Sequence, residues 1–272
     1  MPVELVIIRT SGDRLQEAPL SEVGGKRLFV KEIEDALYRE EIDIAVHSAK
    51  DMLPVPPEGL MLAAFLPRED PRDALVSPGH IARIADLPPG ATVATVALRR
   101  KALLLHMRPD LKTVPIRDNV DTRLRKLDDG VAQALLLARA GLNRLGRGAV
   151  GMPVPVDDIL PAAGQGAVTV ECRSAASATR SLLAAINHRD TEVCVRAEFA
   201  MQAVLEGSCR TPIAGYAVLE GGRLWLRALV ARPDGSEVIT TERRGGVDDA
   251  RALGEDAGRE LRGRAGPHFF ES

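Results

Sequence analysis

Residues 92–107 read TVATVALRRKALLLHM, and this stretch decides the fold class. Its first residues, Thr92 to Thr95, are small or β-branched and predict a strand, whereas Leu98 to Met107 place apolar residues at the spacing of a helix. A strand that passes directly into a helix is the repeating unit of an α/β fold. Ligands of such folds bind at the carboxyl ends of strands, so the polar residues at this junction are candidates for a site.

Apolar runs and helical patterns alternate in the same way on both sides of this stretch. Further strands are predicted at Val3 to Ile8, Ile42 to Val46, Met61 to Leu66, Thr113 to Ile116 and Ala134 to Ala138. Further helices are predicted at Leu28 to Arg39, Val120 to Leu127 and Ala140 to Leu145. The segment from Leu66 to Asp73 is dense in charge and proline and is predicted to cross between two α/β lobes.

The pattern changes from about Arg189 onward. An amphipathic helix is predicted at Thr191 to Leu205, followed by three strands and a final helix. The strands are Ile213 to Leu219, Leu224 to Val230 and Glu237 to Glu242, and the helix runs from Asp248 to Arg262. Because Gly-Gly and Asp-Gly turns join the strands, we expect antiparallel hairpins in a small α+β unit.

Composition limits the classes of function. The chain has 272 residues, enough for two domains or three small ones, and its net charge of −2 disfavours general nucleic-acid binding. Six of the 36 basic residues are lysine and the rest are arginine, which reflects either a GC-rich genome or a need for forked donors to carboxylates or phosphates. We expect a cytoplasmic protein without a membrane span or signal peptide, because no long apolar run occurs and the three cysteines suggest no disulfide framework.

A charged motif, His47-Ser48-Ala49-Lys50-Asp51, follows the predicted strand Ile42 to Val46. Lys50 supplies a positive charge for an anion, and Asp51 a carboxylate that can accept N–H groups or stabilise a cation. Adjacent opposite charges at the end of a strand also occur by chance. The motif is therefore a candidate site that needs support from elsewhere in the chain.

Two arginine clusters follow strands of one predicted lobe. Arg99 and Arg100 lie at a strand-to-helix junction, where N–H groups and guanidinium forks could hold carboxylates or phosphates. Arg117 and Arg123 lie six residues apart across the start of the next helix. The alternative is a solvent-exposed helix start with Asn119 as N-cap. Two such clusters together favour an anion-binding cleft.

Of the three cysteines, one stands in a loop. Cys172 and Cys194 lie in a predicted strand and helix and are interpreted as buried small hydrophobes. Cys209 lies next to Arg210 in a turn of small residues, where a thiol could ionise and form a covalent bond, although an ordinary loop cysteine is the alternative. The cysteines and five histidines show no metal-ligand spacing, so we predict no metal site.

Taken together, these motifs resemble the porphobilinogen deaminase (hydroxymethylbilane synthase) family. The resemblance rests on several stretches that occur in the family's order and cover most of the chain. They are residues 23–32, His47 to Asp51, Arg68 to Ala74, Leu98 to Arg100, Asn119 with Thr122 to Leu124, Ala140 to Leu142, Arg144 to Gly146, Leu160 to Ala167, and Leu205 to Gly207 with Cys209.

The resemblance implies an architecture of three domains. Residues 1–70 with 161–186 would form one α/β domain similar to a periplasmic-binding-protein lobe, shortened at its N-terminus, and residues 71–160 a second. Residues 187–272 would form an α+β domain with a three-stranded antiparallel sheet and the cofactor-attachment cysteine. The family also implies a monomer whose substrate is a small molecule, with no nucleic-acid or membrane partner.

The resemblance also implies a chemistry. A dipyrromethane cofactor would be bound by a thioether to Cys209, and four porphobilinogens would be joined head to tail, with release of ammonia, into hydroxymethylbilane for tetrapyrrole and heme biosynthesis. Asp51 is similar to the catalytic aspartate that contacts pyrrole nitrogens. The residues similar to the family's cofactor-binding and carboxylate-binding groups are Lys50, Asp51, Thr95, Arg99, Arg100, Arg117 and Arg123. Arginine forks suit such a ligand, because every pyrrole carries two carboxylates.

Several departures from the family pattern leave an alternative open. The strand and helix with which family members begin are absent, Val96 and Ala97 replace two hydroxyl residues, and Asp118 replaces a glycine. A carboxylate in a carboxylate-binding loop would cost on the order of 1 to 4 kcal/mol through repulsion. The alternatives are a catalytically impaired or inactive relative acting as an anion-binding module, and a generic two-lobed binding protein for a small anion.

Overall fold

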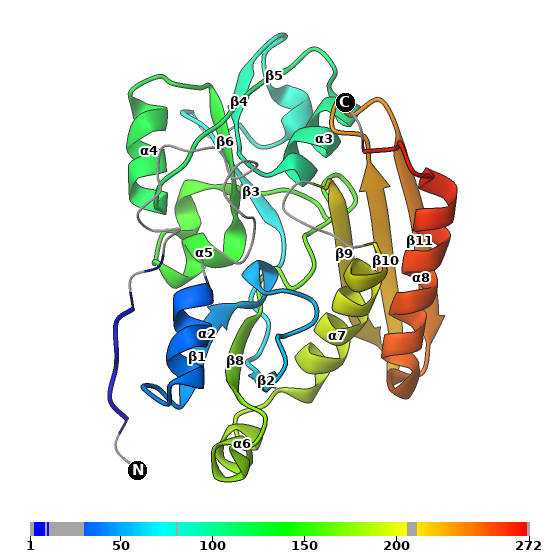
Figure 1. Cartoon of the computed structure of the whole chain (residues 1–272). Coiled ribbons are helices and arrows are strands. Elements are labelled where there is room, and N and C mark those ends of the chain that lie inside the picture. The colour runs from blue at the N-terminus through cyan, green and yellow to red at the C-terminus, as the bar shows by residue number, and fades with distance from the viewer. Residues whose placement is uncertain (1–2, 9, 11–29, 80, 206–210, 271–272) are drawn as a thin grey trace.

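The computed structural model describes residues 3–8, 10, 30–79, 81–205 and 211–270. Its strands form three sheets, and each sheet belongs to one of three packed units, the first lobe, the second lobe and the third unit (Figure 1). The strand orders are β1-β8-β2 in the first lobe, β5-β4-β6-β3-β7 in the second and β11-β10-β9 in the third unit. No helix in the described ranges is long and apolar enough to cross a membrane.

The strands are β1 (Ile44–Ser48), β2 (Leu60–Phe65), β3 (Asp73–Val76), β4 (Thr92–Ala94), β5 (Lys112–Val114), β6 (Ala134–Ala138), β7 (Met152–Pro153), β8 (Val168–Arg173), β9 (Ile213–Glu220), β10 (Arg223–Ala231) and β11 (Val238–Gly245). The helices are α2 (Lys31–Tyr38), α3 (Leu98–Met107), α4 (Val120–Asp128), α5 (Arg139–Arg144), α6 (Ser177–Ala184), α7 (Arg189–Val204) and α8 (Ala250–Ala265). Most agree with the predicted elements to within three residues.

The first lobe is a small antiparallel sheet between two helices. The central strand β8 pairs with β1 on one side and β2 on the other. α2 packs through Leu37 on one face of the sheet, and α6 packs through Leu183 on the other. The strand predicted at Ile42 to Val46 begins at Ile44 and extends to Ser48, which brings the charged motif directly to the end of β1.

The prediction of a strand at Val3 to Ile8 is wrong. These residues form no ladder with the described strands, and the apolar side chains of Val3, Leu5, Val6 and Ile7 are exposed, with Leu5 87% accessible. Figure 1 shows them as a single extended trace at the left of the molecule. An apolar β-branched run favours extended backbone, but a strand forms only where a partner strand completes its hydrogen bonds.

The second lobe is a mixed five-stranded sheet with helices on both faces. β4 runs parallel to β5 and β6, whereas β3 runs antiparallel to β6 and β7. α3 packs through Leu104 on one face, and α4 and α5 pack through Leu127 and Leu142 on the other. Because both faces are covered, the strands are apolar at successive positions, as β6 is throughout.

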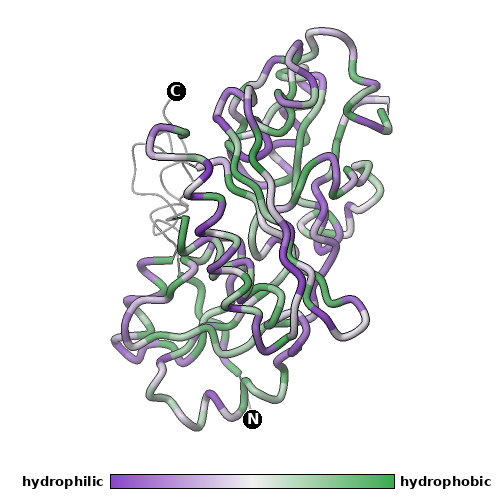
Figure 2. Tube along the Cα trace, turned by 90° about the vertical axis from the view of Figure 1, so that its right-hand side faces the viewer, coloured by the Kyte–Doolittle hydropathy of each residue, from purple (hydrophilic) through white to green (hydrophobic). Residues whose placement is uncertain are grey.

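The third unit is the predicted antiparallel sheet with two helices on one face. α7 and α8 pack closely, because α8 carries Gly258 where a Cβ would lie 2.8 Å from the carbonyl oxygen of Met201. Figure 2 turns this unit toward the viewer, and along β10 more exposed and buried residues alternate from Arg223 to Ala228. On the other face of the sheet, Leu229 packs in the core of the second lobe. Phe199 of α7 packs in a separate core with Phe65 of the first lobe.

Two chain segments connect the lobes and lie side by side. The outgoing segment, residues 66–72, leads from β2 to β3, and the return segment, residues 160–167, leads back to β8. The Leu66 N–H donates to Val168 O over 3.0 Å and the Glu69 N–H to Gly166 O over 3.1 Å. The crossing predicted at Leu66 to Asp73 is therefore present, with Asp73 as the first residue of β3.

Candidate active site

The charged motif forms a turn that the return segment supports from behind. Residues Ala49–Asp51 form a short 3-10 helix directly after β1, with Lys50 half-buried and Asp51 exposed. The N–H of the fully buried Ala49 donates to Ala167 O over 3.0 Å. Gly164 is required here, because its φ is +74° and a Cβ would lie 2.9 Å from the backbone nitrogen of Lys50.

The arginine pair is buried and has an internal counterion. Arg99 and Arg100, in the first turn of α3, are each 6% exposed, and the carboxylate of Asp73 lies between them with no exposure. Arg100 donates from Nε and Nη2 to Asp73 Oδ1 over 3.0 and 2.8 Å, and Arg99 Nη2 lies 2.8 Å from Oδ2. Although burial raises it, the pKa of Asp73 falls to about 2 because Arg100 and Arg99 stabilise its charge.

Both arginines are also fixed by carbonyl oxygens. Arg99 Nη1 donates to Leu160 O over 2.7 Å, and Arg100 Nη1 donates to Leu136 O over 3.0 Å. A guanidinium has five N–H donors, so these contacts leave hydrogens on each side chain for a further acceptor. The pair is thus oriented by the protein before any ligand arrives.

Electrostatic effects show that cations from both lobes share one region. Burial lowers the pKa of Lys50, and Arg100 and Arg99 lower it further, against the opposite effects of Asp51 and Asp73. Burial also lowers the pKa of Arg123, as does Arg100. Burial is the largest cause of both shifts, and the smaller contributions of the arginines mean that these cations lie close enough to repel one another. The cations predicted from sequence at the ends of strands in the two lobes therefore lie near one another at the junction of the lobes.

The loop before α4 differs from the expectation in one respect. Asn119 caps the helix, since its Oδ1 accepts the N–H of Thr122 over 2.9 Å, as the helix-start interpretation predicted. Asp118 has a φ of +102°, and its carboxylate accepts a hydrogen bond from Lys126 Nζ over 2.6 Å. Arg123 Nε donates to Asp118 O over 2.7 Å. The acidic charge is thus paired with α4, which offsets the repulsion expected from sequence.

The remaining predicted site residues have different outcomes. Thr95 is buried after β4, where its Oγ1 accepts the N–H of Ala97 over 3.2 Å. Arg117 is half-buried and near enough to Arg123 to lower the pKa of that guanidinium. Cys209 lies outside the described residues. Cys172 and Cys194 are buried, as predicted, and burial raises the pKa of the Cys194 thiol to about 12.

Three polar residues of the junction were not predicted from sequence. They are Asp73, Gln165 and Glu198, all at most 1% exposed. Arg68 forms a bidentate pair with Glu198 at 2.6 and 3.1 Å, and Gly164 N–H donates to the same carboxylate over 2.7 Å. One signal was available, because Asp73 introduces the apolar run Ala74 to Val76 directly after the charged crossing.

Comparison with known proteins assigns the family. Residues 1–181 match the family pattern described as porphobilinogen deaminase, dipyromethane cofactor binding domain, and residues 192–263 match its C-terminal domain. A porphobilinogen deaminase of Paracoccus denitrificans is 55% identical over 98% of this chain and 85% of its own length. The chain belongs to the porphobilinogen deaminase family. A second porphobilinogen deaminase, that of Nitrobacter hamburgensis, is 51% identical over 99% of this chain and 86% of its own length.

Members of the porphobilinogen deaminase family are hydroxymethylbilane synthases, transferases that assemble tetrapyrroles, and the first 181 residues of this chain carry the family's cofactor-binding domain. Among solved structures, a putative periplasmic sulfonate-binding protein of Methylobacillus flagellatus aligns with a TM-score of 0.38 at 15% identity, over 69% of this chain and 55% of that one. This structural similarity is too low to bear on function.

The described residues fit a dipyrromethane. A ligand with two pyrrole rings brings four carboxylates, and the junction offers buried or half-buried cations whose pKa values are lowered by burial and, to a smaller extent, by neighbouring arginines, among them Lys50, Arg99 and Arg123. Burying carboxylates next to these cations would relieve their mutual repulsion. The donor set is one of guanidinium and ammonium groups, and the described ranges contain no group of three or more histidine, cysteine or acidic residues that could hold a metal.

Proposed function

We propose that the junction between the two lobes is the site at which this chain joins four porphobilinogens into hydroxymethylbilane. The observation that carries the proposal is the collection of cations from both lobes, Lys50 from the first and the fixed pair Arg99 and Arg100 from the second, with the arginines near enough to Lys50 to lower its pKa further after burial. Such a region favours a ligand whose negative charge increases as it grows. When bound, the dipyrromethane supplies a primer to which the first porphobilinogen is joined.

Asp51 is the residue to which we assign the chemistry. Its carboxylate is exposed on a turn held by Ala49 and Gly164, so it can face a ligand without losing its position. Departure of ammonia leaves positive charge on the substrate, which a fixed carboxylate stabilises, and the same oxygen atoms can accept and return a proton. The acetate and propionate groups of the ligand would be oriented by Lys50, Thr95, Arg99, Arg100, Arg117 and Arg123.

Cys209 is the proposed attachment point of the dipyrromethane through a thioether. Support comes from its place in the family's motif order and from the other two thiols, which are buried at Cys172 and Cys194. We further propose a monomer in the cytoplasm, with porphobilinogen as the substrate. Light scattering on the purified protein measures the oligomeric state directly.

Intact mass measurement tests the proposal together with an activity assay. Protein from a host that makes porphobilinogen should carry the added mass of two pyrrole units, and Cys209→Ser should lack it. Asp51→Asn should keep that mass and the fold but lose product formation by at least about a hundredfold. As a control, Asp234→Asn changes a carboxylate on a hairpin of the third unit and should retain activity. An unmodified wild-type mass without product would instead favour the inactive anion-binding relative.

A further inference from the structure

Gln165 contacts both connecting segments and the buried counterion at once. It lies on the return segment between Gly164 and Gly166 and is 1% exposed. Its Nε2 donates to Pro71 O over 2.6 Å, on the outgoing segment, and to Asp73 Oδ1 over 2.9 Å. Its own backbone oxygen accepts Nε of Arg68 over 2.9 Å. No sequence motif assigned a role to this side chain.

The Gln165 amide differs from the other partners of Asp73. Arg99 and Arg100 hold the carboxylate by charge, and both extend from the second lobe. The amide is the neutral donor among the described partners, and it comes from the segment that returns to the first lobe. It therefore fixes the orientation of Asp73 relative to the connecting segments without changing the positive charge that a ligand meets.

We propose that Gln165 is a positioning residue, whose amide holds Asp73 so that the guanidinium groups of Arg99 and Arg100 point their remaining hydrogens toward the ligand carboxylates. Because the same amide also contacts Pro71 O, the orientation of Asp73 is tied to the outgoing segment as well as to the return segment. This inference rests on the proposed function only in its premise that the arginine pair binds the ligand carboxylates.

The consequence is an effect on substrate affinity more than on the chemical step. If Gln165 is lost, Asp73 keeps its two arginines but loses the contact that fixes its angle, and the arginine pair becomes free to turn with it. Because ground state and transition state carry the same carboxylates, the loss should raise KM and leave kcat within about threefold. One hydrogen bond to a charged group corresponds to about a tenfold increase in KM.

The experiment compares steady-state kinetics of cofactor-loaded enzyme for Gln165→Met, Arg99→Lys and the double variant. Gln165→Met should raise the KM for porphobilinogen about tenfold. The same change should raise KM only about threefold when Arg99 is already lysine, because Arg100 alone then still depends on the orientation of Asp73. Gln202→Met is the matched control. Gln202 is 7% exposed on α7, and its Oε1 has no hydrogen-bond partner among the described residues, so the KM of the Gln202→Met variant should equal that of wild type.

The outcomes separate the inference from the proposed function. Two results would overturn the inference alone, provided that the wild type is active. One is an unchanged KM in Gln165→Met, and the other is a full tenfold rise in KM when Gln165→Met is added to Arg99→Lys. A wild type without product overturns the proposed function and the premise with it. If Gln165→Met does not fold, Gln165→Asn takes its place in the same cycle, because the shorter amide retains a donor but cannot reach both Pro71 and Asp73.

Discussion

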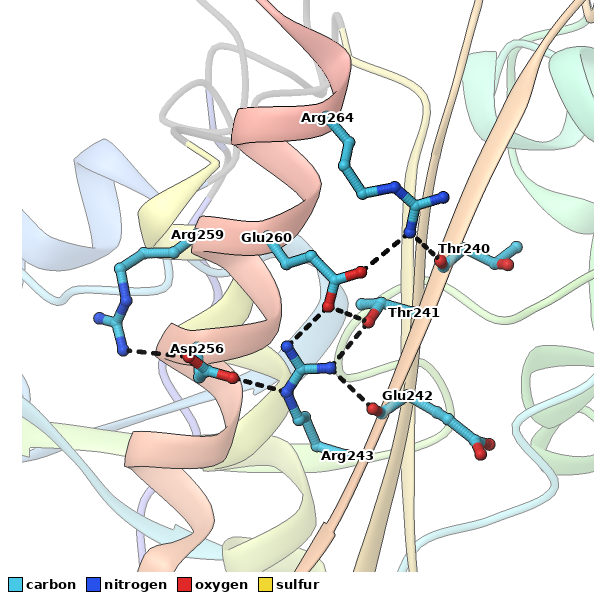
Figure 3. Close-up of polar contacts among 8 residues, drawn as sticks. All are labelled: Thr240, Thr241, Glu242, Arg243, Asp256, Arg259, Glu260 and Arg264. Carbon is cyan, nitrogen blue, oxygen red and sulfur yellow. Dashed lines mark hydrogen bonds and ion pairs between the residues drawn. The ribbon is translucent and has the colours of Figure 1, made fainter.

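Arginine meets carboxylate in two clusters of this chain that differ mainly in burial. At the junction of the lobes, Asp73 lies between Arg99 and Arg100 with no side-chain exposure. On the third unit, Glu260 of α8 accepts hydrogen bonds from Thr241, Arg243 and Arg264, as Figure 3 shows, with about a third of its side chain exposed. Both carboxyl groups have a pKa of about 2, lowered for Asp73 mainly by the charges of Arg100 and Arg99 and for Glu260 mainly by its hydrogen-bond partners.

The comparison shows that two carboxylates with similar pKa values can contribute differently to the free energy of unfolding. Water screens the charges around Glu260, and an exposed ion pair contributes about 0 to 1 kcal/mol. Around Asp73 the charges are removed from water, so each partner depends on the others to compensate the cost of its burial. The buried cluster therefore constrains structure and ligand binding, whereas the exposed cluster joins α8 to β11 weakly.

Removing the buried charge should have the largest effect. Asp73→Asn leaves Arg99 and Arg100 buried beside a neutral amide, and we expect the free energy of unfolding to fall by about 3 to 5 kcal/mol. Urea unfolding followed by circular dichroism measures the loss. A fall of less than about 1 kcal/mol in the free energy of unfolding would contradict the comparison, since the junction would then behave like an exposed ion pair.

Acid should weaken the buried cluster over a defined range. The pKa of Asp73 is about 2 in the folded chain, against 3.8 for an unperturbed aspartate, so its contribution to stability is present above about pH 4 and lost as pH falls through 2. The contribution is on the order of 2 kcal/mol. Measured by urea unfolding, the stability difference between wild type and Asp73→Asn should therefore shrink between about pH 4 and about pH 2. A difference independent of pH in this range would contradict the assignment of the charge to Asp73.

The sequence predicted much of the fold because most elements follow local rules. The strand Ala134–Ala138 and the helix Leu98–Met107 have the bounds expected from apolar periodicity. The segment Val3 to Ile8 shows where this reasoning fails, since its residues have strand propensity but no partner in the described structure. Pairing depends on distant residues, and a local pattern does not contain that information.

The candidate site was predictable in its cations and not in their counterions. Arg99, Arg100 and Lys50 follow strands, so their place at strand ends could be inferred from local sequence. Asp73 and Gln165 act through contacts across 27 and 92 residues of chain, which only the folded structure brings together. The roles of Lys50, Arg99 and Arg100 as binding groups stay predictions until the variants above are measured.

A third ion pair is intermediate in burial and sharpens the comparison. Asp118 pairs with Lys126 with side-chain exposures of 18% and 44%, and its φ of +102° is strained for any residue with a Cβ. Asp118→Gly removes about 1 to 3 kcal/mol of strain and loses a pair worth at most about 1 kcal/mol. We expect a net gain of about 1 kcal/mol in thermal or urea unfolding. Asp118→Ala is the matched control and should lose stability, because it keeps the strain and loses the pair.

Glu260→Gln should have the smallest effect of the series. Arg243 retains Asp256 at 2.6 Å and Arg264 retains Thr240 O at 2.8 Å, so neither guanidinium is left without an acceptor. We expect a loss below about 1 kcal/mol in urea unfolding, and a smaller loss at high salt, because exposed charges are screened. A loss above about 2 kcal/mol that does not depend on salt would mean that α8 requires this contact to pack on β11. Burial would then no longer separate the two clusters, and the number of hydrogen bonds on the carboxylate would explain their stability instead.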